Sequence, residues 1–321
     1  MKQIGGYFEL ELRKGEEYHK EALRLNSGRN AFEYVLRARG YKKVYLPYYT
    51  CDVMLEPINK LKLEYEFYHI NEQLEPIFNF NHIGEDETFV YTNYFGIKSE
   101  VVQKLSNICP NLIIDNSQAF FEKPIAKIDT FYSPRKFLGV PDGAYLYINK
   151  SLQIKLSRDK SVTRFSHLIK RIDEGAEAGY LDFKANDRAL KGQSIKLMSA
   201  LTQALLCNID YNLIIKKRKR NYEFLYKFLR ESNELKLPEE HDFVPMVFPY
   251  RTAKGNVLKQ KLIREGVFVA TYWPNVIEWA ENKSLEYKIA SEMIFLPIDQ
   301  RYNITEIKKI VKLLKTRNNR H

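Results

Sequence analysis

The chain alternates short apolar runs with amphipathic stretches from about residue 28 to residue 148. Residues 29–39 show helical spacing of apolar positions and precede Gly40, which suits the left-handed cap of a helix. Helices are also predicted at about 52–61 and 98–107. Strands are predicted at 44–46, 65–68, 89–91, 112–114, 128–132 and 144–148. Because short apolar strands alternate with helices, we expect an α/β domain whose mostly parallel sheet is covered on both faces.

The rest of the chain predicts a second, smaller unit. Residues 150–195 are polar and irregular, and a long helix is expected at about 195–235. Asn303 or Thr305 could cap the terminal helix. The elements expected after the long helix are strands at 243–248, 267–269 and 294–296 and helices at 253–265, 276–291 and 304–315. We therefore expect a large α/β domain over residues 1–210 and a small C-terminal α+β domain over residues 211–321.

Lysine and arginine outnumber aspartate and glutamate by 51 to 40, which gives a formal charge of +11. The densest basic run, residues 216–220, lies within a helical pattern, so it favours a solvated helix face over a nucleic-acid patch. No nucleic-acid-binding motif accompanies the run. The charge excess remains compatible with a diphosphate-bearing substrate.

Cysteine and histidine usage excludes several classes of site. Cys51, Cys109 and Cys207 form neither a disulfide framework nor a CxxC pair, which favours a reducing cytoplasm. The six histidines show no metal-ligand spacing, so we expect no metal. Residues 1–6 lack the apolar core of a secretory signal, and no window approaches the roughly 18 apolar residues of a membrane span.

Three segments carry candidate chemistry at the ends of predicted strands or the starts of helices, where open α/β sheets bind ligands. Gly28 opens the first helix, whose free N–H groups could bind phosphate, although Asn26 or Ser27 could simply cap it. Asp115 ends an apolar strand, where its carboxylate could keep a pyridine nitrogen protonated or could cap a helix. Lys136 lies between two strands beside Arg135 and aromatic residues, a setting that suits Schiff-base chemistry, although most lysines are surface residues.

The order and local sequences of these segments resemble the DegT/DnrJ/EryC1/StrS aminotransferases, which are fold-type I pyridoxal-phosphate (PLP) enzymes. Residues 27–31 (Ser-Gly-Arg-Asn-Ala) resemble the family's phosphate turn, and residues 114–119 (Ile-Asp-Asn-Ser-Gln-Ala) resemble its Glu-Asp-Ala-Ala-Gln-Ala motif. Residues 134–136 with 142–144 resemble the segment whose lysine carries PLP. Residues 47–50 and 296–298 match further family segments.

The resemblance implies a role for each matching residue. Lys136 carries the cofactor, and Asp115 binds the pyridine nitrogen. Ser117 packs on the ring and Gln118 contacts the phenolic oxygen. The phosphate-binding residues that it implies are Gly28, Arg29, Asn30 and Ser133.

This chain departs from the family pattern at several positions. Phe131 replaces the family's phosphate-binding serine, and Ser133 could substitute for it. Cys51 replaces the aromatic residue that stacks on PLP, so the stacking could come from Tyr49 or from elsewhere in the chain. Residues 186–188 (Asn-Asp-Arg) are a loose match to a segment with which family members complete the partner subunit's phosphate site.

The resemblance implies an aminotransferase that moves an amino group from glutamate to a nucleotide-linked keto-sugar, for surface polysaccharide or secondary-metabolite sugars. It also implies a homodimer with shared active sites, whereas the lack of a membrane-span window and of a nucleic-acid motif predicts no membrane or nucleic-acid partner. Phe131 and Cys51 motivate an alternative, a PLP-fold binding or regulatory protein without transaminase activity. A basic nucleic-acid-associated protein is the third and weakest hypothesis.

Overall fold

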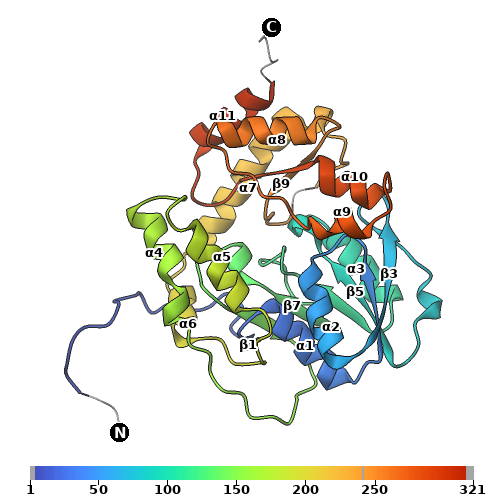
Figure 1. Cartoon of the computed structure of the whole chain (residues 1–321), viewed down its shortest axis with the longest axis vertical. Helices are drawn as coiled ribbons and strands as arrows, with labels where there is room; N and C mark the ends of the chain where they lie inside the picture. Colours follow the sequence, from blue (N-terminus) through green and yellow to red (C-terminus); the bar gives the residue numbers. More distant parts are fainter. Residues whose placement is uncertain (1–3, 241, 316–321) are drawn as a thin grey trace.

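The computed structural model describes residues 4–240 and 242–315 and is built around an eight-stranded mixed sheet (Figure 1). The strand order is β1-β8-β7-β6-β5-β2-β3-β4. The strands are β1 (Leu23–Leu25), β2 (Lys43–Pro47), β3 (Glu64–Ile70), β4 (Pro76–Ile77), β5 (Glu87–Thr92), β6 (Leu112–Asp115), β7 (Asp129–Tyr132) and β8 (Ala144–Tyr147). Strands β3, β2, β5, β6 and β7 run parallel, whereas β1, β4 and β8 pair antiparallel. The predicted mostly parallel sheet is thus confirmed.

Helices cover both faces of the sheet. The first face packs on α1 (Gly28–Arg39) and α2 (Leu55–Leu61), with Phe32, Ile113 and Phe131 in one buried cluster. Gly40 ends α1 with φ 77°, which confirms the predicted left-handed cap. The opposite face packs on α3 (Ser99–Ile108) through a second, larger cluster, defined by residues such as Leu105 and Ile114.

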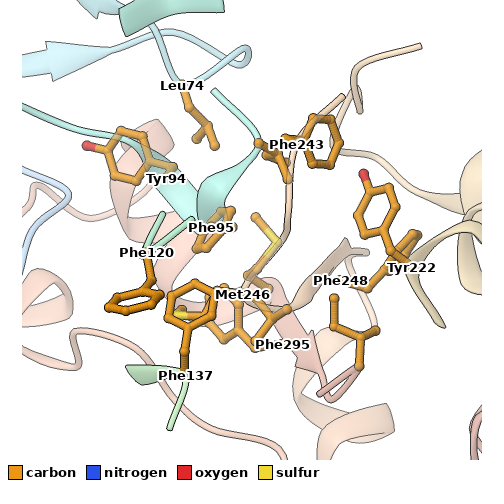
Figure 2. Packing of buried hydrophobic residues seen from close by; sticks show 14 of the residues in the cluster. Leu74, Tyr94, Phe95, Phe120, Phe137, Tyr222, Phe243, Met246, Phe248 and Phe295 are labelled. Carbon is orange, nitrogen blue, oxygen red and sulfur yellow. The ribbon is translucent and has the colours of Figure 1, made fainter. Parts of the chain in front are cut away.

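The C-terminal part adds a small antiparallel pair of strands, β9 (Phe248–Arg251) and β10 (Met293–Leu296). Around it lie α7 (Tyr211–Leu229), α8 (Gly255–Arg264), α9 (Asn275–Trp279), α10 (Leu285–Glu292) and α11 (Ile304–Lys315). Figure 2 shows Phe95, Phe120 and Phe137 of the large sheet unit packing near Met246 and Phe295. Because one apolar cluster runs through both units, the division at residue 210 stays a prediction.

Some predicted elements are wrong in extent. The long helix expected at 195–235 is two helices, α6 (Ala200–Cys207) and α7, because Asp210 caps α7 by accepting the Leu213 N–H at 2.9 Å. Residues 150–195 contain α4 (Ser166–Asp173) and α5 (Tyr180–Ala189).

Errors of the same kind occur in the small unit. The helix expected at 276–291 is likewise broken into α9 and α10, where Ser284 caps α10. Residues 267–269 form no strand; only Ala270 bridges to Phe295. The strand expected at 243–248 begins only at Phe248. Asn303 immediately precedes α11, whereas Thr305 lies inside it, so Thr305 is not the cap.

The basic run of α7 is not a solvated face throughout. Arg218 is 2% exposed, although Lys216 faces solvent. The Arg218 guanidinium donates to the carbonyls of Met246 at 2.8 Å and Phe137 at 3.3 Å. Burial lowers its pKa to about 10. The run therefore supplies a buried tie between the two units as well as surface charge.

Candidate active site

Lys136 ends a short turn, Pro134–Lys136, between β7 and β8, at the carboxyl end of the sheet. Its side chain is exposed, and its Nζ lies 5.9 Å from the ring centre of Tyr272. Within residues 4–240 and 242–315, no carboxylate forms an ion pair with Lys136. The amine is therefore presented on the surface of the turn without a charged protein partner.

Asp115 ends β6, and the charge of Lys136 acts on its carboxyl group. Its side chain is 7% exposed, and Oδ1 accepts the Ser117 backbone N–H at 2.8 Å. Burial raises the pKa of this carboxyl, while the hydrogen bonds from Ser117 and the charge of Lys136 act in the opposite direction. In the described part of the chain no cation is within ion-pair distance of Asp115. A buried carboxylate in this state favours a cationic or hydrogen-donating ligand.

The backbone of the loop after β5 orients the side chain of Gln118. Its Oε1 accepts the Phe95 N–H at 2.9 Å, which leaves the amide NH₂ to donate elsewhere. Phe95 itself has φ 58°, and a side chain on Gly96 would come within 2.8 Å of the Gln118 carbonyl. The loop after β5 thus fits closely against Gln118 and fixes which end of its amide is free.

The start of α1 offers two free backbone donors. Ser27 caps the helix by accepting the Asn30 N–H at 3.3 Å, whereas the N–H groups of Gly28 and Arg29 have no acceptor in the described chain. A Cβ on Gly28 would lie 3.6 Å from Ser117 Oγ, so Ser117 and the helix start share one small space. Such a helix start is suited to binding an anion.

Two predicted residues of this turn face other parts of the protein. The Arg29 guanidinium pairs with Glu56 at 2.6 Å. The Asn30 side chain donates to the Gln193 carbonyl at 2.9 Å and is 1% exposed. The side chains of Arg29 and Asn30 therefore hold the turn in place, and only the backbone of Arg29 is free to contact a ligand.

Ser133 and Arg135 lie beside Lys136 on the same turn. The Ser133 hydroxyl has no hydrogen-bond partner in the part of the chain that the structure covers. Arg135 pairs with Asp187 at 3.2 Å, and Asn186 donates to the Pro141 carbonyl at 2.8 Å. The Asn-Asp-Arg segment thus packs on the lysine turn of its own subunit.

The structure explains two departures from the family pattern. Phe131 is 1% exposed and packs against Phe32 under α1, with ring centres 5.9 Å apart, so its position belongs to the core. Tyr49 is fully buried, with its ring against Tyr94 and Trp273, so the expectation that it stacks on a cofactor is wrong. The charge of Lys136 acts on Cys51, whose pKa is raised mainly by burial.

Tyr272 and Arg218 border the site without any sequence motif to mark them. Burial raises the pKa of Tyr272 to about 12, although the charge of Arg218 lowers it. Arg218 and Gln300 both donate to the carbonyl of Phe137, the residue after Lys136, at 3.3 Å and 2.9 Å. Arg218 and Gln300 therefore tie the small unit to the lysine turn. Only contacts between residues that are far apart in the sequence reveal the roles of Tyr272, Arg218 and Gln300.

No group of three metal-ligating side chains occurs within the described ranges, outside which His241 and His321 lie. None of the helices in the described chain is long and apolar enough to cross a membrane.

The sequence matches no family model and no curated protein. Solved structures match over most of the chain. DesV of S. venezuelae is 15% identical with a TM-score of 0.65, over 92% of this chain and 84% of that one. A putative sugar aminotransferase, Spr1654 from Streptococcus pneumoniae in its PMP form, is 14% identical with a TM-score of 0.62, over 92% and 86%. A DegT DnrJ EryC1 StrS aminotransferase from Brucella abortus is 14% identical with a TM-score of 0.60, over 92% and 85%.

These likenesses define the class of fold. The chain has the fold of the fold-type I PLP aminotransferases, and structures of DegT/DnrJ/EryC1/StrS proteins are among those that share it. The predicted fold class is confirmed.

Proposed function

We propose that this protein is a PLP-dependent aminotransferase that acts on a sugar. The observation that carries the proposal is the buried Asp115, which has no cationic partner and lies near the unpaired amine of Lys136. The fold supports the proposal, because sugar aminotransferases share it.

The side chains at this edge of the sheet fit PLP. Asp115 offers a carboxylate to the pyridine nitrogen, and Gln118 offers a free amide donor to the phenolic oxygen. The N–H groups of Gly28 and Arg29, with the hydroxyl of Ser133, offer donors to the phosphate, and Ser117 beside the helix start packs on the ring. Lys136 offers the amine for covalent attachment.

When bound, PLP supplies an aldehyde carbon that carries the amino group and a ring that accepts negative charge. Lys136 anchors the cofactor through Nζ and, once released, takes and returns the substrate proton at Nζ. Asp115 keeps a proton on the ring nitrogen through its carboxylate. Gln118 orients the ring through its amide nitrogen, and the start of α1 binds the phosphate.

The finer proposals are that glutamate is the amino donor and that a nucleotide-linked keto-sugar is the acceptor, in the cytoplasm, for polysaccharide or secondary-metabolite sugars. A formal charge of +11 supports a diphosphate-bearing substrate.

We also propose a homodimer with shared sites. Residues 4–11 are exposed and extend away from the body of the molecule (Figure 1), and Tyr7 and Phe8 are almost fully exposed. Ile172 and Leu181 on the α4–α5 pair are exposed as well. Apolar side chains in such numbers favour burial against a second copy.

Spectral titration tests the activity. Purified protein loaded with PLP should change its visible spectrum on addition of glutamate, and a suitable keto-sugar nucleotide should reverse the change. An unchanged spectrum would favour the alternative of a PLP-binding protein without activity, which the replacement of the phosphate serine by Phe131 motivates. Failure of the protein to take up PLP would overturn both.

A further inference from the structure

A cavity of about 600 Å³ opens on the face of the sheet opposite the candidate active site. Ile114 of β6 and Asn116 line it, whereas the intervening Asp115 faces Lys136. Successive residues of a strand point to opposite faces of the sheet, which separates the two spaces. The other walls come from the start of α3, the loop at 121–125 and the segment at 242–244.

Two buried amides on the cavity wall have unused polar atoms. Asn93 is 0% exposed; its Oδ1 accepts the Lys98 N–H at 3.0 Å, but its Nδ2 has no partner within the described chain. Asn116 is 2% exposed, and its Oδ1 has none there either. Buried polar atoms are rarely left unpaired, because losing a hydrogen bond to water is costly. The wall therefore offers both a donor and an acceptor to a ligand.

The charges around the cavity nearly cancel. The lining carries two carboxylates, Glu122 and Asp242, and two lysines, Lys123 and Lys219, and Lys219 pairs with Asp242 at 3.3 Å. This balance selects neither a strong anion nor a strong cation. Burial raises the pKa of Glu122, and the carboxylate offers acceptors to hydroxyl donors.

We propose that this cavity is a binding site for an uncharged, polyhydroxylated molecule of monosaccharide size. Hydroxyl groups both donate and accept, which suits the two amides and the carboxyl. The rings of Phe121 and Phe243, the latter labelled in Figure 2, offer apolar surface to the C–H face of a pyranose. The volume lies within the range of about 300–1,000 Å³ found for small-molecule sites. The site does not depend on the proposed transaminase activity.

Saturation-transfer NMR on the PLP-loaded protein tests the proposal, with D-glucose, N-acetyl-D-glucosamine and myo-inositol as separate probes. Gln103 is an exposed residue of α3 on the cavity lining, so Gln103→Trp should block the cavity without disturbing the core. Asn107→Trp, about one turn further along α3 and outside the lining, is the matched control.

We expect saturation transfer to at least one probe with wild type and Asn107→Trp, and a signal at least tenfold weaker with Gln103→Trp. Ser99→Ala, which removes one hydroxyl from the lining, should weaken binding roughly 2- to 10-fold. Absence of transfer to all three probes would overturn the proposal. Equal transfer with Gln103→Trp would overturn it too, since the probe would then bind elsewhere.

Discussion

Replacement of Asp115 by Asn should have opposite effects on the protein with and without cofactor. Burial raises the pKa of Asp115 in the folded chain, so the folded state favours the protonated carboxyl. This contribution to stability is present below the unfolded-state pKa and is lost as the pH rises through the folded-state pKa. At neutral pH the ionised carboxylate therefore costs stability, which an amide does not.

The size of each effect follows from the contacts. Asn keeps an Oδ1 acceptor for the Ser117 N–H, so Asp115→Asn should stabilise the apoprotein by about 1 kcal/mol. That gain corresponds to a rise of roughly 2 °C in Tm for a chain of this size. In the presence of PLP the variant loses a charge-assisted hydrogen bond of about 1.5–3 kcal/mol, which weakens PLP binding roughly 10- to 150-fold.

Thermal unfolding of the apoprotein and spectroscopic titration with PLP measure the two effects. Asp142→Asn is the matched control, because Asp142 is also buried but accepts hydrogen bonds from Ser199 and Thr202. Burial raises the pKa of Asp142 as it does that of Asp115, so the control separates the effect of a buried charge from cofactor binding, and Asp142→Asn should keep PLP affinity within about twofold. A destabilised Asp115→Asn apoprotein with unchanged PLP affinity would refute the role given to this carboxylate.

Three further substitutions test other parts of the structure. Arg218→Met should lower the free energy of unfolding by about 3–5 kcal/mol in urea titrations, because the Phe137 and Met246 carbonyls lose a buried donor; a loss below about 1 kcal/mol would contradict this. Phe131→Ser should destabilise the protein by about 3–5 kcal/mol in the same assay and should not tighten PLP binding, since position 131 lies under α1; tighter binding would contradict its assignment to the core. Burial lowers the pKa of His19 to about 4, so wild type should lose about 2 kcal/mol of stability between pH 7 and pH 5 as pH falls below the unfolded-state value, and His19→Gln should not; equal losses would contradict this.

Local sequence signals predicted the sheet unit well. Apolar runs such as 112–114 and the helix closed by Gly40 depend on neighbouring residues, and the structure places both where the pattern predicts them. Errors arose where a short cap overrides a continuous apolar pattern, as at Asp210 between α6 and α7 and at Ser284 before α10. The strand predicted at 267–269 does not form, because this segment has β propensity but only the neighbouring Ala270 pairs with another strand, through one bridge to Phe295.

The residues of the candidate site also separate into those that local signals predicted and those that only long-range contacts position. Local position brought Asp115 and Lys136 into consideration and the family resemblance added Gln118, and the fold places all three at the carboxyl edge of the sheet. The positions of Tyr272 and Arg218 depend on packing against the lysine turn between residues more than 80 positions apart, which no local pattern encodes. The loss of Tyr49 to the core is of the same long-range kind.

The central claim is that Lys136 carries PLP, and borohydride trapping tests it most directly. Protein incubated with PLP, reduced and digested should yield a pyridoxyl-modified peptide that contains Lys136. Lys136→Ala should lose both this adduct and the visible absorption band, while Lys150→Ala, at an exposed lysine beyond β8, should keep both. A wild-type protein with no adduct, or with its adduct on a different lysine, would contradict the account.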